Sequence, residues 1–227
     1  MEAIAYSVRR SPRARRPRLE IGRTGLELVV PTQMRLAEAL PLVEEKRPWI
    51  ERTLRRVDAA AAAIGVARLE DGGAIPYLGR ELALRVELEP QRLRPRVTAD
   101  DAGLHVRLAR ADDLRCALET WFRASARVEI GSRLDAATAR AGSQYSRLTI
   151  RGQRTRWASC SQSGGMSFNW RLLLAPATIL DYVVEHEVAH LEIADHSQRF
   201  WRLVAQRCPD YRERASWLRR HGTALWL

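Results

Sequence analysis

The spacing of apolar residues divides the first third of the chain into short strands and one helical stretch. Partial alternation of apolar and polar positions predicts strands at residues 3–8, 19–21 and 26–30. Apolar residues at helical spacing then run from about Leu36 to Ile64. Pro41 and Pro48 suit first turns of helices, and Gly65 suits the end of this stretch.

After a turn at residues 71–73, the pattern returns to short strands. Between residues 82 and 88, leucine and valine alternate with alanine, arginine and glutamate, as in a strand with one buried face. The strands are expected at residues 75–78, 82–88, 96–98 and 104–108. Residues 1–109 should therefore form a β-rich N-terminal domain with a helical insertion.

The second half of the chain is mainly helical. Apolar residues recur every three or four positions from about Asp112 to Ala141, which predicts a long amphipathic helix that Gly142 ends. Short strands are expected next, at residues 147–150, 154–158 and 166–169. Further helices are expected at residues 177–191, at residues 200–207 with Ser197 as cap, and from Pro209 to about Arg220.

Size and composition indicate a folded protein that does not span a membrane. The chain has 227 residues, 46% of them hydrophobic, and no apolar stretch approaches 18 residues. Arg9-Arg10 is not followed by the apolar segment of a secretory signal. The three cysteines, Cys116, Cys160 and Cys208, form neither a CxxC pair nor a disulfide framework, so a cytoplasmic location is expected.

The formal net charge is +11, and arginine supplies all but one of the 38 basic residues, Lys46 being the exception. The densest run, residues 7–18, holds six arginines and no acid. One arginine can donate two parallel hydrogen bonds to the oxygens of a phosphate, so this run could form an arm that binds nucleic acid or phosphate. The near-exclusive use of arginine throughout the chain favours the simpler interpretation of a solvated edge segment.

One segment has the spacing of a metal site. Residues 186–190 read His-Glu-Val-Ala-His, within an expected helix. At 3.6 residues per turn, His186 and His190 share one face, so both imidazoles can reach one ion. Glu187 is one step around the helix and can reach a metal-bound water without binding the metal. The alternative is a helix face that happens to carry two histidines packed in a core.

His196 extends this pattern. It lies six residues after His190, and a continuing helix would point it away from the pair, so the helix must break near residues 191–195. The spacing is that of a three-histidine zinc site with an open fourth position. Metzincins place glycine at this break, whereas this chain has Ile193, so the turn must be built differently. The competing third ligands are the distant Glu213 and the nearby Glu192 and Asp195.

Such a site implies metal-assisted hydrolysis. Zinc lowers the pKa of its bound water towards about 7 and polarises a scissile carbonyl. Glu187 is then expected to take the proton of that water and pass it to the leaving group. Ligating histidines usually donate their second N–H to a carboxylate or carbonyl, and Asp195 and Glu185 are candidates. The candidates for stabilising an oxyanion are Tyr182, Tyr211, Arg151 and Arg156.

Several motifs together resemble one known family. The chain reads Arg-Trp-Ala-Ser-Cys-Ser at 156–161, Phe-Asn-Trp-Arg-Leu at 168–172 and Asp-His-Ser at 195–197. Its first half adds Val-Arg-Arg-Ser at 8–11, Lys-Arg-Pro-Trp-Ile at 46–50 and Tyr-Leu-Gly at 77–79. With the histidine motif, these resemble the YgjP-like metallopeptidase family, a group of predicted metal-dependent hydrolases related to SprT-like and WLM zinc proteases. The resemblance covers nearly the whole chain.

The resemblance implies that His186, His190 and His196 hold zinc and that Glu187 is catalytic. The chain departs from the family at Ala158, where glycine is usual, and the added methyl would narrow a cleft lined by this backbone. Cys160 could be a ligand or nucleophile, but the role of a small buried residue in a strand suits it better.

We therefore expect an α+β fold in which residues 110–227 form a zincin-like metallohydrolase domain, helical with a short antiparallel or mixed sheet. The expected function is a zinc-dependent hydrolase, foremost a metallopeptidase acting on a peptide or protein. One alternative is a nucleotide pyrophosphatase or phosphohydrolase at the same site, favoured by Arg151, Arg154 and Arg156 but without a glycine-rich phosphate loop. Another is a nucleic-acid-associated protease of SprT-like type, suggested by the basic charge.

Overall fold

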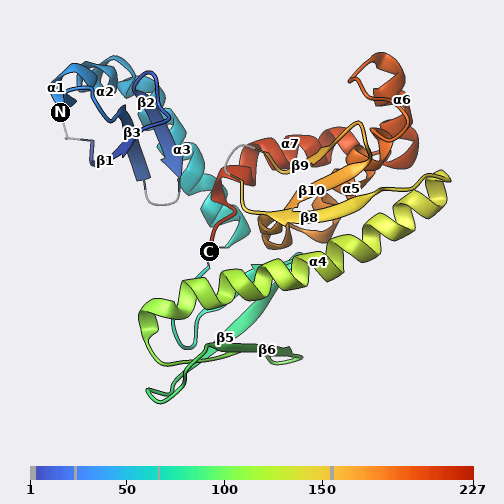
Figure 1. The fold of residues 1–227 in the computed structure, drawn as a ribbon, viewed down its shortest axis with the longest axis horizontal. Helices are drawn as coiled ribbons and strands as arrows, with labels where there is room; N and C mark the ends of the chain where they lie inside the picture. Colours follow the sequence, from blue (N-terminus) through green and yellow to red (C-terminus); the bar gives the residue numbers. More distant parts are fainter. Residues whose placement is uncertain (1–3, 23–24, 66, 154–155) are drawn as a thin grey trace. The chain divides into compact units, whose positions relative to one another are not determined.

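The computed structural model describes residues 4–22, 25–65, 67–153 and 156–227 (Figure 1). The chain divides into two compact units, Met1–Ile64 with Arg220–Ala224, and Gly65–Arg219 with Leu225–Leu227. Helices and three small sheets make up both units, which confirms the α+β class. The expected domain boundary after residue 109 falls inside the second unit. No helix of the described part is both long and apolar enough to cross a bilayer.

The first unit is a three-stranded sheet packed against helices. Strand β3 (Gly25–Pro31) lies centrally, parallel to β1 (Tyr6–Ser11) and antiparallel to β2 (Arg18–Gly22). Three helices follow, α1 (Leu36–Ala39), α2 (Pro41–Glu45) and α3 (Arg47–Ile64), and the short 3-10 turn η3 (Gly222–Ala224) packs on the last of them. Alternate residues of β3 enter the core, and Pro41 opens α2 as expected. The first expected strand lies later than residues 3–8, and Ala3 is outside the described residues.

The arginine-rich run at residues 7–18 covers most of strand β1, the turn after it and the first residue of β2. Arg9 donates to Glu27 at 2.8 Å and to Glu20 at 3.1 Å, while Arg18 also binds Glu20. Arg10 donates to backbone carbonyls near the end of β3. Three of the six arginines of the run are thus engaged within the sheet, and a role of this run in binding nucleic acid stays a prediction.

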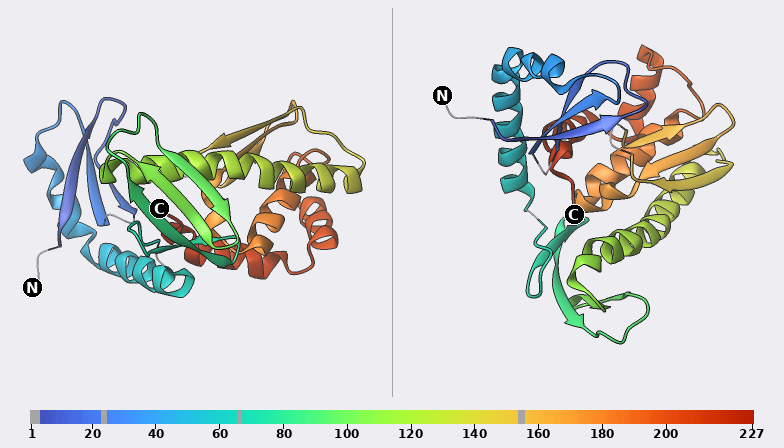
Figure 2. Two further views of the ribbon diagram at one scale, coloured as in Figure 1. Left: turned by 90° about the horizontal axis from the view of Figure 1, so that it is seen from below. Right: turned by 60° about the vertical axis from the view of Figure 1, so that its left-hand side comes forward.

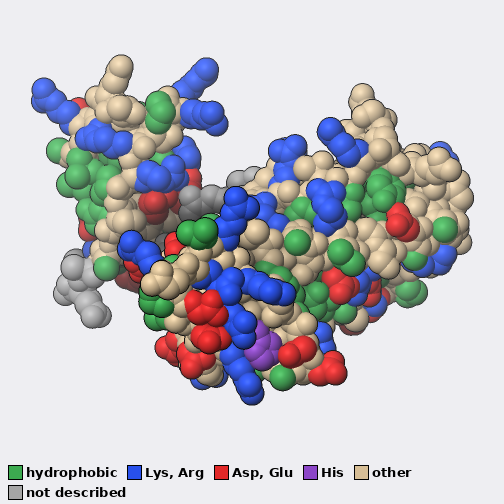
Figure 3. All heavy atoms as spheres, turned by 60° about the horizontal axis from the view of Figure 1, so that its bottom comes forward, with side chains coloured by type: hydrophobic (Ala, Val, Ile, Leu, Met, Phe, Trp, Pro, Cys, Tyr) green, Lys and Arg blue, Asp and Glu red, His purple; other side chains and the backbone are tan. Residues whose placement is uncertain are grey.

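The second unit begins with a four-stranded sheet in the order β4 (Ala74–Tyr77), β5 (Arg80–Leu88), β7 (Gly103–Leu108) and β6 (Arg96–Asp100). The short turn η1 (Ala111–Asp113) leads into α4 (Leu114–Ala141), which lies across one face of this sheet (Figure 2). The alternation in β5 and β7 buries Leu82, Leu84, Leu104 and Leu108 and leaves charged residues exposed on the outer face. Figure 3 shows basic and acidic side chains intermixed at this outer face.

A second small sheet lies on the other part of α4. Strand β10 (Gly165–Asn169) runs parallel to β8 (Arg147–Arg151) and antiparallel to β9 (Ala158–Cys160), so the sheet is mixed. The turn η2 (Trp170–Leu174) leads to helices α5 (Ala177–Ala189), α6 (Gln198–Arg207) and α7 (Tyr211–His221). Ser197 stands at the N-cap position of α6, but its hydroxyl makes no capping bond.

The strand expected at residues 154–158 is wrong for its described part, because Arg156 and Trp157 are not in a strand and β9 begins at Ala158, while residues 154 and 155 lie outside the described residues. The Asn169 side chain explains the difference. Its Nδ2 donates to the carbonyls of Gln153 and Arg156, at 2.7 and 3.3 Å, so a side chain instead of a strand ladder satisfies this backbone. Arg154 lies outside the described residues.

Phe122 of α4 connects the two layers of the second unit. Its ring is fully buried and packs against Tyr77 and Trp121 on one side and Trp170 on the other, with centroid distances of 5.0–6.0 Å. Tyr77 belongs to β4, and Trp170 begins η2, which leads into α5. This aromatic cluster therefore ties the four-stranded sheet to the base of the helix that carries the histidine motif.

We expect Phe122→Ala to destabilise the second unit by about 3–5 kcal/mol, because truncation of a buried aromatic leaves a cavity between these layers. Val128→Ala on the same helix is the matched control, since Val128 is 72% exposed and its loss should cost less than about 0.5 kcal/mol. Urea unfolding followed by circular dichroism measures both. Equal midpoints for the two variants would contradict the role assigned to Phe122.

Candidate metal centre

Helix α5 carries the histidine motif and is buried on nearly all sides. Its apolar residues Ile179, Leu180, Val183, Val184 and Val188 are all buried. Helices α4 and α6, strand β9 and η2 surround it. Because most of its side chains are apolar and buried, packing largely fixes the position of this helix.

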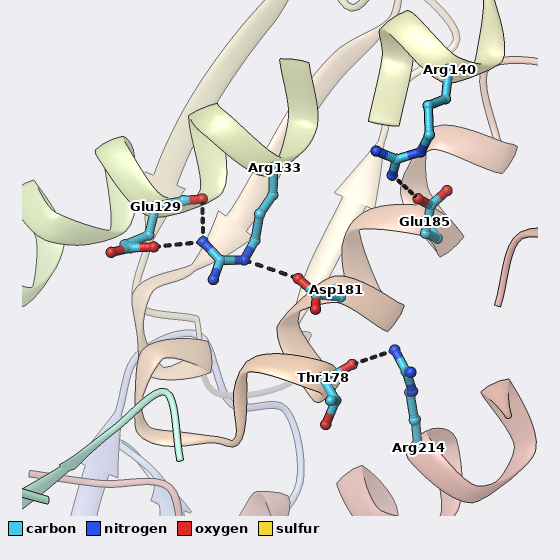
Figure 4. Close-up of polar contacts among 7 residues, drawn as sticks. All are labelled: Glu129, Arg133, Arg140, Thr178, Asp181, Glu185 and Arg214. Atoms are coloured by element: carbon cyan, nitrogen blue, oxygen red, sulfur yellow. Dashed lines mark hydrogen bonds and ion pairs between the residues drawn. The ribbon is translucent and has the colours of Figure 1, made fainter. Parts of the chain in front are cut away.

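Polar contacts also fix α5 against its neighbours (Figure 4). From α4, Arg133 donates to Asp181 at 2.9 Å, and Arg140 donates to Glu185 at 2.5 Å. From α7, Arg214 donates to the carbonyl of Thr178 at 3.0 Å. These contacts are spread along the helix, so they resist both sliding and rotation of the segment that carries His186 and His190.

The structure brings the three expected histidines together. One ring nitrogen from each of His186, His190 and His196 lies within 4.8 Å of the others, and such a group of three metal-ligating side chains could hold an ion. The Nε2 atoms of His186 and His196 are 3.2 Å apart. Two nitrogens bound to one tetrahedral zinc at 2.0–2.1 Å would lie about 3.3 Å apart. The separation of this pair suits two ligands of one ion, and the third ring nitrogen lies within 4.8 Å of both.

His196 reaches the pair because the helix ends immediately before His190. The Ala189 carbonyl accepts the N–H groups of Glu192, at 3.2 Å, and Ile193, at 3.0 Å, which closes a turn and redirects the chain. Leu78 is the only described non-glycine residue with a positive φ, so Ile193 needs no glycine-like conformation. The predicted break is confirmed, although α5 ends at Ala189 and not at residue 191.

The same turn orients His190. Its Nδ1 lies 3.1 Å from the carbonyl of Ile193. Because a carbonyl only accepts, Nδ1 carries the proton, and Nε2 is left with its lone pair towards the other histidines. Burial is the main cause of the lowered pKa of both rings, and the pKa of His186 falls to about 4. Both rings are therefore neutral near pH 7, as metal binding requires.

Aromatic side chains of α6 form the floor of the histidine cluster. Phe200 is fully buried, and its ring centroid lies 4.4–5.0 Å from those of all three histidines. Trp201 lies 5.7 Å from His186 and 5.6 Å from His196, and it stacks on Tyr211. This packing places α6 beside the His196 turn, and it restricts the rotation of the imidazoles.

Glu187 is 5% exposed and lies beside strand β9. Burial raises its pKa to about 7, and a hydrogen bond from the backbone N–H of Cys160 partly opposes this rise. Its Oε2 is buried without a hydrogen-bond partner among the described residues. A carboxylate with one fixed and one free oxygen, and with a pKa near neutrality, can both accept and return a proton.

A cleft of about 390 Å³ opens beside these groups. Helix α5 and the His196 turn form one side, and strand β9 with the residues around it forms the other. Its lining residues are Arg156, Ala158, Ser159, Cys160, Ser161, Gln162, His186, Glu187, His190, Ala194 and His196. Ala158 is among them, so its methyl occupies space that a glycine would leave open.

Other expected participants lie elsewhere. Glu213 is not part of the three-residue ligand group. Among the candidates for partners of the histidines, Asp195 accepts the Ser197 N–H at 3.0 Å, while Glu185 pairs with Arg140. Glu192 pairs with Arg207. Of the four oxyanion candidates, only Arg156 lines the cleft, whereas Arg151, Tyr182 and Tyr211 do not.

Sequence reasoning missed two backbone groups. The carbonyl of Ile193 orients His190, and the N–H of Cys160 binds Glu187. The sequence could suggest the first, because a tight turn must follow the helix. No side-chain signal marks the second. The Cys160 thiol itself is half-buried, and its raised pKa, caused mainly by burial and then by Glu187, argues against a thiolate nucleophile.

Comparisons with known proteins agree with this chemistry. A profile described as the YgjP-like metallopeptidase domain matches residues 15–221. The crystal structure of the metallopeptidase zymogen abylysin of Pyrococcus abyssi is 27% identical, covers 40% of this chain and 96% of its own, and has a TM-score of 0.35. The crystal structure of the metallopeptidase zymogen jannalysin of Methanocaldococcus jannaschii is 16% identical, covers 38% of this chain and 93% of its own, and has a TM-score of 0.34. These scores are too low to define the fold of the whole chain.

No curated protein matches this sequence significantly. The match to the family profile spans both compact units, from the arginine-rich run to the end of α7, and it includes every residue of the histidine cluster. Membership implies a metal-dependent peptidase that uses a divalent ion, and the three histidines are a group that could bind one. This chain belongs to the YgjP-like metallopeptidase family.

Proposed function

We propose that this enzyme is a zinc peptidase in which His186, His190 and His196 bind the ion and Glu187 is the general base. The observation that carries the proposal is the convergence of three ring nitrogens within 4.8 Å, beside a buried carboxylate with one free oxygen. Three imidazole ligands and an open fourth position are typical of catalytic zinc.

The residues divide the work between them. A bound zinc ion would polarise the scissile carbonyl and lower the pKa of the attacking water. Glu187 accepts the proton of that water on Oε2 and later gives it to the leaving amine. The Cys160 N–H keeps the carboxylate in place during both transfers. Phe200 excludes water from the buried side of the histidines.

Strand β9 supports a peptide as the substrate. It is an edge strand, because the sheet order is β8-β10-β9, and its residues line the cleft. An edge strand offers free backbone groups along which an extended peptide can pair. A peptide held in this way would pass directly beside Glu187 and the histidines.

A second candidate substrate is a nucleotide. Arg156 favours it, since this residue lines the cleft and a guanidinium can bind a phosphate. Arg151 does not line the cleft, and Arg154 lies outside the described residues. Incubation of the zinc-loaded protein with unfolded casein and, separately, with nucleoside triphosphates discriminates the two, and we expect hydrolysis of casein. Release of pyrophosphate or phosphate with intact casein would favour the nucleotide.

We expect Glu187→Gln to lower casein hydrolysis by about 10²–10⁴-fold while zinc content stays near that of the wild type, because an amide cannot accept the proton. Glu192→Gln is the matched control, being an exposed carboxylate just beyond the same helix. Elemental analysis and peptide assays measure both properties. Substantial turnover by Glu187→Gln would remove the general-base assignment.

His196→Ala should lower the zinc content from about one ion per chain to a small fraction after dialysis, since two remaining ligands bind zinc weakly. Glu213→Ala should retain the ion. Elemental analysis of both variants, with circular dichroism to verify folding, decides which residue is the third ligand. The opposite pattern would point to a carboxylate ligand from α7.

A further inference from the structure

The cleft beside the histidines has one positively charged side chain among its described lining residues. It belongs to Arg156, and Glu187 is the one acid among those described residues. Glu187 already receives the Cys160 N–H. None of the ion pairs among the described residues includes Arg156, whose side chain is exposed at the edge of the cleft.

The backbone at Arg156 is held firmly although its side chain is exposed. Asn169 is 4% exposed, and its Nδ2 donates to the carbonyls of Arg156, at 3.3 Å, and Gln153, at 2.7 Å. The Asn169 N–H donates to the carbonyl of Trp157 at 2.7 Å. The chain is thus anchored on β10 immediately before β9 begins. A guanidinium attached to a fixed backbone loses less conformational entropy when it pairs with a carboxylate than one attached to a mobile loop.

We propose that Arg156 gives this peptidase a preference for substrates that carry an aspartate or glutamate near the bond to be cleaved. The proposal rests on the peptidase function proposed above. A carboxylate is the natural partner for an unpaired guanidinium, because the two groups match in charge and in planar geometry. A substrate with a lysine at the same place would instead meet a like charge.

The position of Arg156, two residues before β9 begins, indicates where the acidic residue of the substrate lies. Cys160, whose N–H binds Glu187, is four positions further along the chain. An extended chain advances about 3.3 Å per residue, so a peptide aligned on β9 reaches Arg156 roughly three to five residues from the bond opposite Glu187. This distance separates Arg156 from the reacting atoms and makes it a residue for specificity.

Another role for Arg156 predicts a different result. A guanidinium that stabilises the oxyanion would raise the rate for every peptide, whatever its side chains. A specificity residue affects acidic peptides alone, and it does so already at the binding step. Binding to a protein that cannot cleave therefore separates the two roles without any measurement of turnover.

The test uses the zinc-loaded Glu187→Gln protein and fluorescent peptides that differ only by Glu, Gln or Lys at positions three to five residues from the centre. We expect the Glu peptide to bind about three- to tenfold more tightly than the Gln peptide, because the exposed position of Arg156 weakens an ion pair there. Adding Arg156→Gln should abolish this difference, and Arg156→Glu should reverse it in favour of the Lys peptide. Arg147→Gln on β8, outside the cleft, is the matched control and should change nothing.

Equal binding of the Glu and Gln peptides, or no binding of either, would overturn the proposal. So would an equal loss of affinity for all peptides in Arg156→Gln. Displacement of the Glu peptide by a nucleoside triphosphate at much lower concentration than by a second acidic peptide would assign Arg156 to phosphate recognition instead. Failure of the peptidase function appears separately, as wild-type protein that binds the Glu peptide selectively but leaves casein intact.

Discussion

The candidate metal centre depends on one backbone interaction, the acceptance of two N–H groups by the carbonyl of Ala189. This turn stops α5 at the residue where a further helical turn would carry His196 away from the other histidines. It also presents the Ile193 carbonyl to His190, so a single reversal of the chain sets both the position of one ligand and the tautomer of another. The side chains alone could not achieve this convergence.

Burial of the motif explains why so much of the second unit is devoted to holding α5. A buried carboxylate and two half-buried imidazoles carry a desolvation cost, and an apolar shell with dispersed ion pairs must offset it. The aromatic cluster around Phe122, the ion pairs from α4 and the Phe200 floor provide this support. The four-stranded sheet is thus part of the same structural unit as the metal centre, although it lies before it in sequence.

Much of this could be predicted from the sequence. Hydrophobic spacing located the helices and most strands because their packing is local and periodic, and the histidine spacing identified residues that do meet in space. The start of β9 was misplaced because Asn169, distant in sequence, satisfies the backbone that a strand ladder would otherwise need. The division of the chain after Ile64 was not predicted either. The four-stranded sheet belongs to the second unit because α4 packs on it, and the hydrophobic pattern of the strands does not reveal that contact.

The N–H of Cys160 has a consequence for how the enzyme would measure its substrate. This short edge strand would guide an incoming chain, and one of its own peptide groups already restrains the proposed proton acceptor. The strand that would align the substrate and the backbone that holds Glu187 are therefore the same three residues, Ala158–Cys160. Any displacement of that strand would shift the place of cleavage and the basicity of Glu187 at once, so evolution could not easily tune one without disturbing the other.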